Sequence, residues 1–123
     1  MNYLESLEDY LERILMLTER NGHVRSIDIA NDMGFSKPSV SIAMKKLKEK
    51  GLIEIDSKGY ISLINDGICI AEATYEKHKL IFNLLRGFGV SEEVAREDAC
   101  KIEHALSDET VEKLKEYQEK KNK

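Results

Sequence analysis

Three side chains near the C-terminus combine different kinds of metal ligand at helical spacing. Cys100, Glu103 and His104 stand at positions i, i+3 and i+4, and residues with this spacing share one face of an α-helix. A thiol, a carboxylate and an imidazole can each coordinate a divalent transition metal. The pattern therefore predicts a metal site, although Cys-x-x-Glu-His on its own is only moderately specific.

Two other segments offer further candidate ligands. Asp9 and Glu12 form an i, i+3 carboxylate pair, although such a pair is more often a solvated acidic helix face. His78 follows Tyr75-Glu76-Lys77, and a single histidine is more often a structural polar residue than a ligand. None of these segments identifies a metal site by itself.

Positive charge is concentrated in the middle of the chain. The 123 residues carry a net charge of −4, but residues 36–62 contain six basic and three acidic groups. A nucleic-acid-binding surface needs a local basic patch rather than a basic total. The alternative is that these lysines form an ordinary solvated helix face.

The elements around this basic segment form a pattern that is typical of a winged helix. Helical periodicity predicts a first helix over 4–20, a short second helix over 27–33 that Ser26 caps, and a third helix with Pro38 in its first turn. Gly34 provides the tight turn between the second and third helices. Alternating residues over 52–63, interrupted by Ser57-Lys58-Gly59, predict a β-hairpin after the third helix.

A helix-turn-helix with this hairpin indicates where DNA would be contacted. Hydroxyls and a compact proline ring in the first turns of the third helix can reach phosphates and base edges, while the later lysines and the hairpin turn suit backbone contacts. The candidate DNA-binding residues are Ser36, Lys37, Pro38, Ser39, Ser41, Lys45, Lys46 and Lys58.

The C-terminal half is predicted to be entirely helical, with helices over 66–86, 92–106 and 108–119. The fold class is therefore mainly α: a winged helix-turn-helix over 1–64 and a helical dimerisation and metal-binding domain over 65–123. Two cysteines are too few for a disulfide scaffold in a chain of this size. Cys69, which stands in Gly67-Ile68-Cys69-Ile70, is predicted to be a small buried hydrophobic residue.

Several segments, in order, resemble the diphtheria toxin repressor family of iron- and manganese-dependent repressors. The resemblance is carried by S-L-E-D-Y-L-E-R-I at 6–14, S-K-P-S-V-S at 36–41, E-K-H-K-L at 76–80 and C-K-I-E-H-A-L-S-D at 100–108. It covers nearly the whole chain. The two-domain architecture is similar to that of the manganese transport regulators.

The resemblance implies a ligand set with features of both branches of the family. The positions that match ligands of the manganese-type members are Asp9, Glu12, His78, Glu103 and His104. Cys100 instead matches the iron-type members, because the manganese-type members have glutamate there. Two further positions of an iron-type second site are occupied here by Phe82 and Arg96, which puts a two-metal arrangement in doubt.

The implied function is a homodimeric, metal-dependent transcriptional repressor that binds a palindromic double-stranded DNA operator and controls metal-ion homeostasis genes. The metal is Fe²⁺ or Mn²⁺, with Co²⁺ or Zn²⁺ binding in vitro, and the Cys100 thiol favours Fe²⁺ slightly.

Two alternative functions share some of these features. The first is a metal-independent winged-helix regulator that responds to a small molecule. The second is a metallohydrolase that uses Glu103 beside His104, but the sequence has no His-Glu-x-x-His helix and no glycine-rich phosphate loop, so an enzyme is not expected. No apolar run is long enough for a membrane span and no signal-peptide pattern opens the chain, so a cytoplasmic protein is expected.

Overall fold

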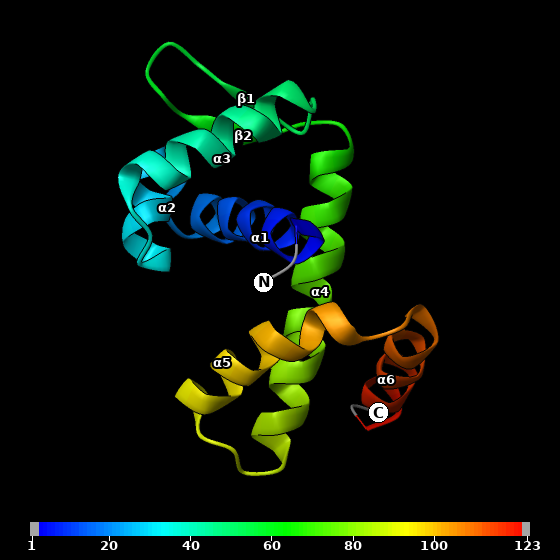
Figure 1. The fold of residues 1–123 in the computed structure, drawn as a ribbon. Helices are drawn as coiled ribbons and strands as arrows, with labels where there is room; N and C mark the ends of the chain where they lie inside the picture. The colour runs from blue at the N-terminus through cyan, green and yellow to red at the C-terminus, as the bar shows by residue number, and fades with distance from the viewer. Residues whose placement is uncertain (1–2, 122–123) are drawn as a thin grey trace. The chain divides into compact units, whose positions relative to one another are not determined.

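The computed structural model describes the backbone of residues 3–121 and the side chains of residues 6–121. Its elements follow the chain in the order α1 (Tyr3–Asn21), α2 (Ser26–Met33), α3 (Lys37–Glu49), β1 (Ile53–Ile55), β2 (Ile61–Leu63), α4 (Asp66–Gly87), α5 (Glu92–Ile102), the 3₁₀ turn η1 (Glu103–Ala105) and α6 (Asp108–Lys121) (Figure 1). The chain divides into two compact units, and the boundary between them falls within α4, between Ala73 and Thr74.

The N-terminal unit is built around one apolar core. Helices α1 and α3 each bury one face, and strands β1 and β2 each contribute one buried isoleucine. Removing such side chains from water is the main favourable contribution to folding. The fully buried residues of this core include Leu11, Ile14, Val24, Ile29, Val40, Met44 and Ile53.

The helix-turn-helix is fixed by residues that suit each helix end. Gly34 follows α2 in the left-handed conformation, with φ 71°, which glycine adopts without steric cost. The Ser36 hydroxyl caps α3 by accepting the Ser39 N–H, and Pro38 lies in the first turn of that helix. The predicted cap of α2 was wrong by one residue, because Ser26 is already helical and Arg25 occupies the N-cap position.

The predicted hairpin is an antiparallel pair in which Ile53 faces Leu63 and Ile55 faces Ile61. A second backbone contact, from the Ile61 N–H to the Val24 carbonyl at 2.8 Å, ties the loop before α2 to this hairpin. The described part of the chain therefore has the predicted class: it is mainly helical, with a winged helix-turn-helix followed by further helices.

The start of α4 lies tightly against the segment that follows α3. The Asn65 side chain donates from Nδ2 to the Gly51 carbonyl at 3.2 Å. Gly67 is buried, and a Cβ atom at this position would lie only 2.0 Å from the Leu52 carbonyl oxygen. This close approach explains why a glycine stands in the first turn of a helix.

In the C-terminal unit, α5 and α6 both lie beside the C-terminal half of α4 (Figure 1). Lys115 of α6 forms a 2.8 Å ion pair with Glu76 of α4, and the Gln118 amide donates to the Leu80 carbonyl at 2.7 Å. Ser91 and Ser107 cap α5 and α6, as predicted. The helix predicted to continue to residue 106 instead ends at Ile102 and tightens into a 3₁₀ turn.

Cys69 corrects a second expectation, because its side chain is exposed rather than buried. Gly67 and Ala71, on the opposite side of the same helix, are the buried residues. Among the described residues, no helix is both long enough and apolar enough to cross a membrane.

Candidate metal centre

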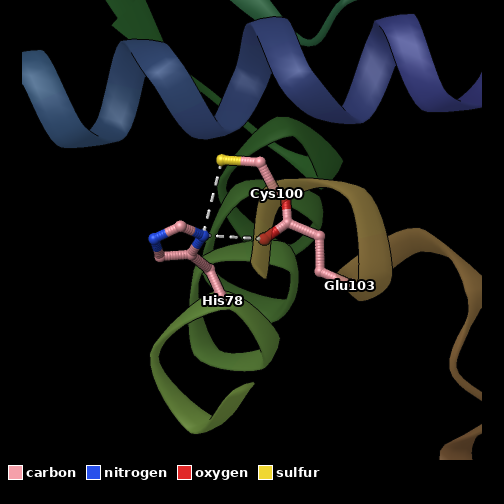
Figure 2. Close-up of side chains that lie close together, drawn as sticks. All are labelled: His78, Cys100 and Glu103. Carbon is pink, nitrogen blue, oxygen red and sulfur yellow. Dashed lines mark hydrogen bonds and ion pairs between the residues drawn. The ribbon is translucent and has the colours of Figure 1, made fainter. Parts of the chain in front are cut away.

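Three of the predicted ligands converge inside the C-terminal unit (Figure 2). His78 Nδ1 lies 3.1 Å from Glu103 Oε2 and 3.7 Å from Cys100 Sγ. One ligand atom from each residue lies within 4.8 Å of those of the other two. Nitrogen, sulfur and oxygen donors therefore face a common point, which is the arrangement that a divalent transition metal requires.

Three elements position these donors. Helix α4 provides His78, whose ring is stacked on Phe82 with a centroid separation of 6.3 Å and an interplanar angle of 12°. Cys100 lies in the last turn of α5 and Glu103 opens η1. Residues at i and i+3 lie on the same side of both an α-helix and a 3₁₀ turn, so the tightening at Glu103 keeps its carboxylate beside Cys100.

The cluster is unusually buried for groups of this polarity. His78 is 6% exposed and Glu103 is 1% exposed. Removing a carboxylate from water costs several kcal/mol unless an opposite charge and hydrogen bonds offset it. The second oxygen of Glu103 lies 3.4 Å from His104 Nε2, so one buried carboxylate contacts two imidazoles and lies beside a thiol. A divalent cation fits this donor set, and His78, Cys100 and Glu103 are the residues that would hold it.

Two of the three remaining predicted ligands, Asp9 and Glu12, lie on α1 in the N-terminal unit. Asp9 is partly buried, and Glu12 is only 1% exposed. An ordinary solvated acidic face would leave both carboxylates in water, so the burial of Glu12 argues against that alternative. His104 belongs to the C-terminal unit and contacts the cluster through Glu103.

The positions that differ from an iron-type second site have other roles here. Phe82 is the ring that stacks on His78. Arg96 forms an ion pair with Glu92 one turn earlier in α5, at 2.9 Å. These two side chains therefore add no ligand atom to the centre.

The predicted DNA-binding side chains are all exposed, on α3 and on the turn of the hairpin. Sequence reasoning missed one neighbour on the same surface: Ile42, which is 58% exposed in the middle of α3. It stands outside the buried stripe of that helix, which could have identified it. An apolar side chain on the exposed face of a recognition helix can contact thymine methyl groups.

A winged helix followed by helices that carry a buried ligand cluster defines the class of metal-responsive DNA-binding regulators. The N-terminal DNA-binding domain of iron-dependent repressors matches residues 2–61, and the metal-binding and dimerisation domain of iron-dependent repressors matches residues 65–122. The chain therefore belongs to the iron-dependent repressor family, whose members are metal-dependent, DNA-binding transcriptional repressors and not enzymes.

Curated relatives agree with this assignment. The chain is 40% identical over 118 residues to an uncharacterised helix-turn-helix-type transcriptional regulator of Methanocaldococcus jannaschii, covering 94% of each chain. It is 36% identical over 110 residues to the transcriptional regulator MntR of Bacillus subtilis, covering 89% of this chain and 77% of the relative.

Solved structures of similar proteins share the fold. The manganese regulator SloR matches with a TM-score of 0.77 and 33% identity, covering 92% of this chain and 53% of SloR. T. acidophilum IdeR matches with a TM-score of 0.79 and 27% identity, covering 89% of this chain and 52% of IdeR. The chain thus spans about half the length of these two solved structures.

Proposed function

We propose that this protein is a homodimeric, cytoplasmic repressor that binds a palindromic operator when loaded with Fe²⁺ or Mn²⁺ and so controls genes of metal-ion homeostasis. The observation that carries the proposal is the buried cluster of His78, Cys100 and Glu103 in a chain whose other unit exposes a lysine-rich recognition helix. The functional division falls after residue 64, and the two family matches, which end at 61 and begin at 65, support it.

The donor set narrows the choice of metal. Imidazole and carboxylate ligands suit both Mn²⁺ and Fe²⁺, whereas a thiolate shifts preference towards Fe²⁺ and the later metals Co²⁺ and Zn²⁺. Because Cys100 contributes its sulfur to the cluster, we favour Fe²⁺ over Mn²⁺ as the activating metal. Asp9, Glu12 and His104 are proposed as further ligands, as the family resemblance implies.

The DNA-binding mode follows from the exposed residues of α3 and the hairpin. The first turns of α3 would enter the major groove, with Lys45, Lys46 and Lys58 contacting the backbone. A two-fold dimer presents two such helices, and their spacing must match that of two operator half-sites. A bound metal would supply the positive charge that stabilises the buried Glu103 carboxylate, and with it one arrangement of the ligand-bearing helices.

The test is DNA binding with and without metal under reducing, anaerobic conditions. A duplex selected from a random pool by metal-loaded protein is titrated in Fe²⁺, in Mn²⁺ and in a chelator. We expect metal to raise affinity about tenfold or more, within the usual range of such couplings. Equal affinity in the chelator would contradict the switch and would favour the metal-independent regulator.

A matched pair of variants tests whether Cys100 of the cluster binds the metal. Cys100→Ser removes the sulfur ligand, whereas Cys69→Ser changes the same residue type at an exposed position on α4. We expect Cys100→Ser to weaken metal binding about tenfold or more, because loss of even an outer-shell partner of a ligand costs about that much, with the fold retained by circular dichroism. Cys69→Ser should behave like the wild type. Equal metal binding by both variants would remove Cys100 from the ligand set.

A further inference from the structure

His78 is the middle member of a row of three rings on α4. Tyr75 stands three residues before it and Phe82 four residues after it, so all three side chains lie on one face of the helix. The Tyr75 and His78 ring centroids are 6.4 Å apart with an angle of 32° between the ring planes, and those of His78 and Phe82 are 6.3 Å apart with an angle of 12°. These three residues are called the ring row below.

The orientation of the His78 ring decides whether this residue can share a metal with the other two members of the cluster. Nδ1 lies 3.1 Å from Glu103 Oε2 and 3.7 Å from Cys100 Sγ, and the second ring nitrogen lies on the far edge of the ring (Figure 2). A metal bound by Nδ1 must lie near the plane of the imidazole, because the lone pair of that nitrogen lies in this plane. A tilt of the ring would therefore direct the lone pair away from the point that the thiol and the carboxylate face.

The imidazole has little intrinsic preference for one plane. The torsion that turns it about its bond to Cβ is broad and roughly two-fold, so neighbouring atoms must set the orientation. Phe82 presents an almost parallel ring, and aromatic rings with centroids about 4.5–7 Å apart favour offset-stacked or edge-to-face arrangements. The ring row thus favours one plane for His78, and the contact with Glu103 selects the edge that carries Nδ1.

The ring row is well placed to maintain this plane. Its members belong to one helix, so the backbone fixes their spacing, and side chains on a helix are positioned more precisely than those on a loop. His78 is buried, and the two flanking rings are half-buried. Tyr75 also contacts Lys79, whose Nζ atom lies 4.4 Å from the ring centroid. Phe82 has no donor atom, so its effect on a bound metal must act through His78.

We propose that Phe82, together with Tyr75, is a positioning residue of the metal centre: it packs against the His78 imidazole and holds the plane in which Nδ1 meets a metal bound by Cys100 and Glu103. The inference rests on the proposed function, since it requires that the cluster binds a metal. It assigns a role in metal affinity to side chains that contribute no ligand atom.

The first test is Co²⁺ binding by the full chain under reducing, anaerobic conditions, in competition with a chelator of known affinity. Phe82→Leu keeps apolar bulk but removes the ring face. We expect it to weaken Co²⁺ binding about tenfold, which is within the cost of losing a side chain that orients a metal-binding histidine. Phe82→Tyr keeps the ring and should retain the wild-type affinity.

Two further comparisons make this result specific to the ring row. Phe88→Leu is the matched control, because it makes the same change at a side chain that is 73% exposed directly after α4, and it should bind Co²⁺ like the wild type. Tyr75→Leu and Tyr75→Phe repeat the comparison at the other flanking ring, with the loss expected in the first variant alone.

The spectra of the Co²⁺-loaded protein separate positioning from a general structural role. An imidazole bound through Nδ1 keeps an exchangeable proton on Nε2, which gives a strongly shifted proton resonance beside Co²⁺. The chain has three histidines, so loss of a resonance in His78→Gln assigns it. In Phe82→Leu we expect this resonance to move, whereas the absorption band from the Cys100 thiolate to Co²⁺ and the unfolding midpoint of the metal-free protein should match the wild type.

The possible failures of the two proposals are distinguishable. Wild-type affinity and an unmoved His78 resonance in Phe82→Leu overturn the positioning role, as does a loss of affinity that Phe82→Tyr shares. A lowered unfolding midpoint with both spectral features weakened would mean that Phe82 only supports the fold, and it also overturns the role. A wild-type protein that binds no Co²⁺, or shows neither spectral feature when loaded, would instead contradict the proposed function.

Discussion

Cys100 is the residue on which the chemistry of the centre most depends. Its sulfur lies 3.7 Å from His78 Nδ1, beside a carboxylate that is almost fully buried. A thiolate is a softer ligand than a carboxylate and suits a different set of metals. The two neighbours, His78 and Glu103, are compatible with either Fe²⁺ or Mn²⁺. We therefore expect the residue at position 100 to determine which of these metals binds more tightly.

Replacing this sulfur by a carboxylate should change metal selectivity. In Cys100→Glu, we expect the ratio of the Mn²⁺ and Fe²⁺ dissociation constants to shift towards Mn²⁺ by about tenfold, because an all-nitrogen-and-oxygen donor set suits the harder ion. Anaerobic competition titrations against a chelator of known affinity measure both constants. A selectivity ratio identical to that of the wild type would mean that position 100 does not set metal preference.

At the scale of elements, local chemistry made the helix ends predictable where the residue itself provides the cap. Gly34, Pro38 and Ser107 have the predicted roles. The end of α5 was not predictable in the same way, because the 3₁₀ turn begins at Glu103, whose carboxylate contacts His78, 25 residues earlier in the chain. That contact is tertiary, so no sequence window around Glu103 contains it.

The predicted burial of Cys69 was wrong for a different reason. Its apolar neighbours suggested burial, but residues that are adjacent in sequence do not lie on the same face of a helix. Gly67 and Ala71 are four residues apart and both buried, whereas Cys69 lies between them and points away from that side. Counting helical positions from Gly67 would have placed Cys69 in solvent.

Gly67 provides a test of how tightly the start of α4 packs within the N-terminal unit. In Gly67→Ala the added Cβ would meet the Leu52 carbonyl oxygen and carbon at 2.0 and 2.9 Å, and backbone cannot move aside as a flexible side chain can. We expect a loss of about 2–4 kcal/mol in the free energy of unfolding, typical of a severe steric conflict in a packed region. Urea denaturation followed by circular dichroism measures it.

Gly87→Ala is the internal control for this measurement. It lies at the other end of the same helix, where the new Cβ would meet only the Lys121 Nζ atom at 3.4 Å. Because alanine has the higher helix propensity, we expect a change of less than about 1 kcal/mol, neutral or stabilising. Equal stability of the Gly67 and Gly87 variants would show that the contact with Leu52 relaxes without cost.

For the whole molecule, the sequence was most informative about organisation and least informative about geometry. The order of a helix-turn-helix, a hairpin and three helices followed from periodicity and turn residues, and the structure has that order. Convergence of His78 with Cys100 and Glu103 could be expected only through family resemblance, because 22 and 25 residues separate them from the histidine.

A repressor switched by metal must also bind metal more tightly when it is on DNA. Thermodynamic linkage requires that the factor by which Mn²⁺ raises operator affinity equal the factor by which operator raises Mn²⁺ affinity. We expect the two factors to agree within error when the first comes from fluorescence anisotropy with and without Mn²⁺. The second comes from Mn²⁺ titrations, followed by electron paramagnetic resonance of the free ion, with and without saturating operator.

A double variant that removes two positive charges from α3 distinguishes this linkage from simple attraction of Mn²⁺ to DNA. Lys45→Ala with Lys46→Ala removes two exposed charges of α3 and should weaken operator binding without altering Mn²⁺ affinity in the absence of DNA, because neither residue is among the candidate ligands. Operator at a concentration that saturates the wild type but not this variant should then leave the variant's Mn²⁺ affinity nearly unchanged. If operator raised Mn²⁺ affinity equally in both proteins, the ions would be gathering on the DNA itself, and the coupling between metal centre and recognition helix would be refuted.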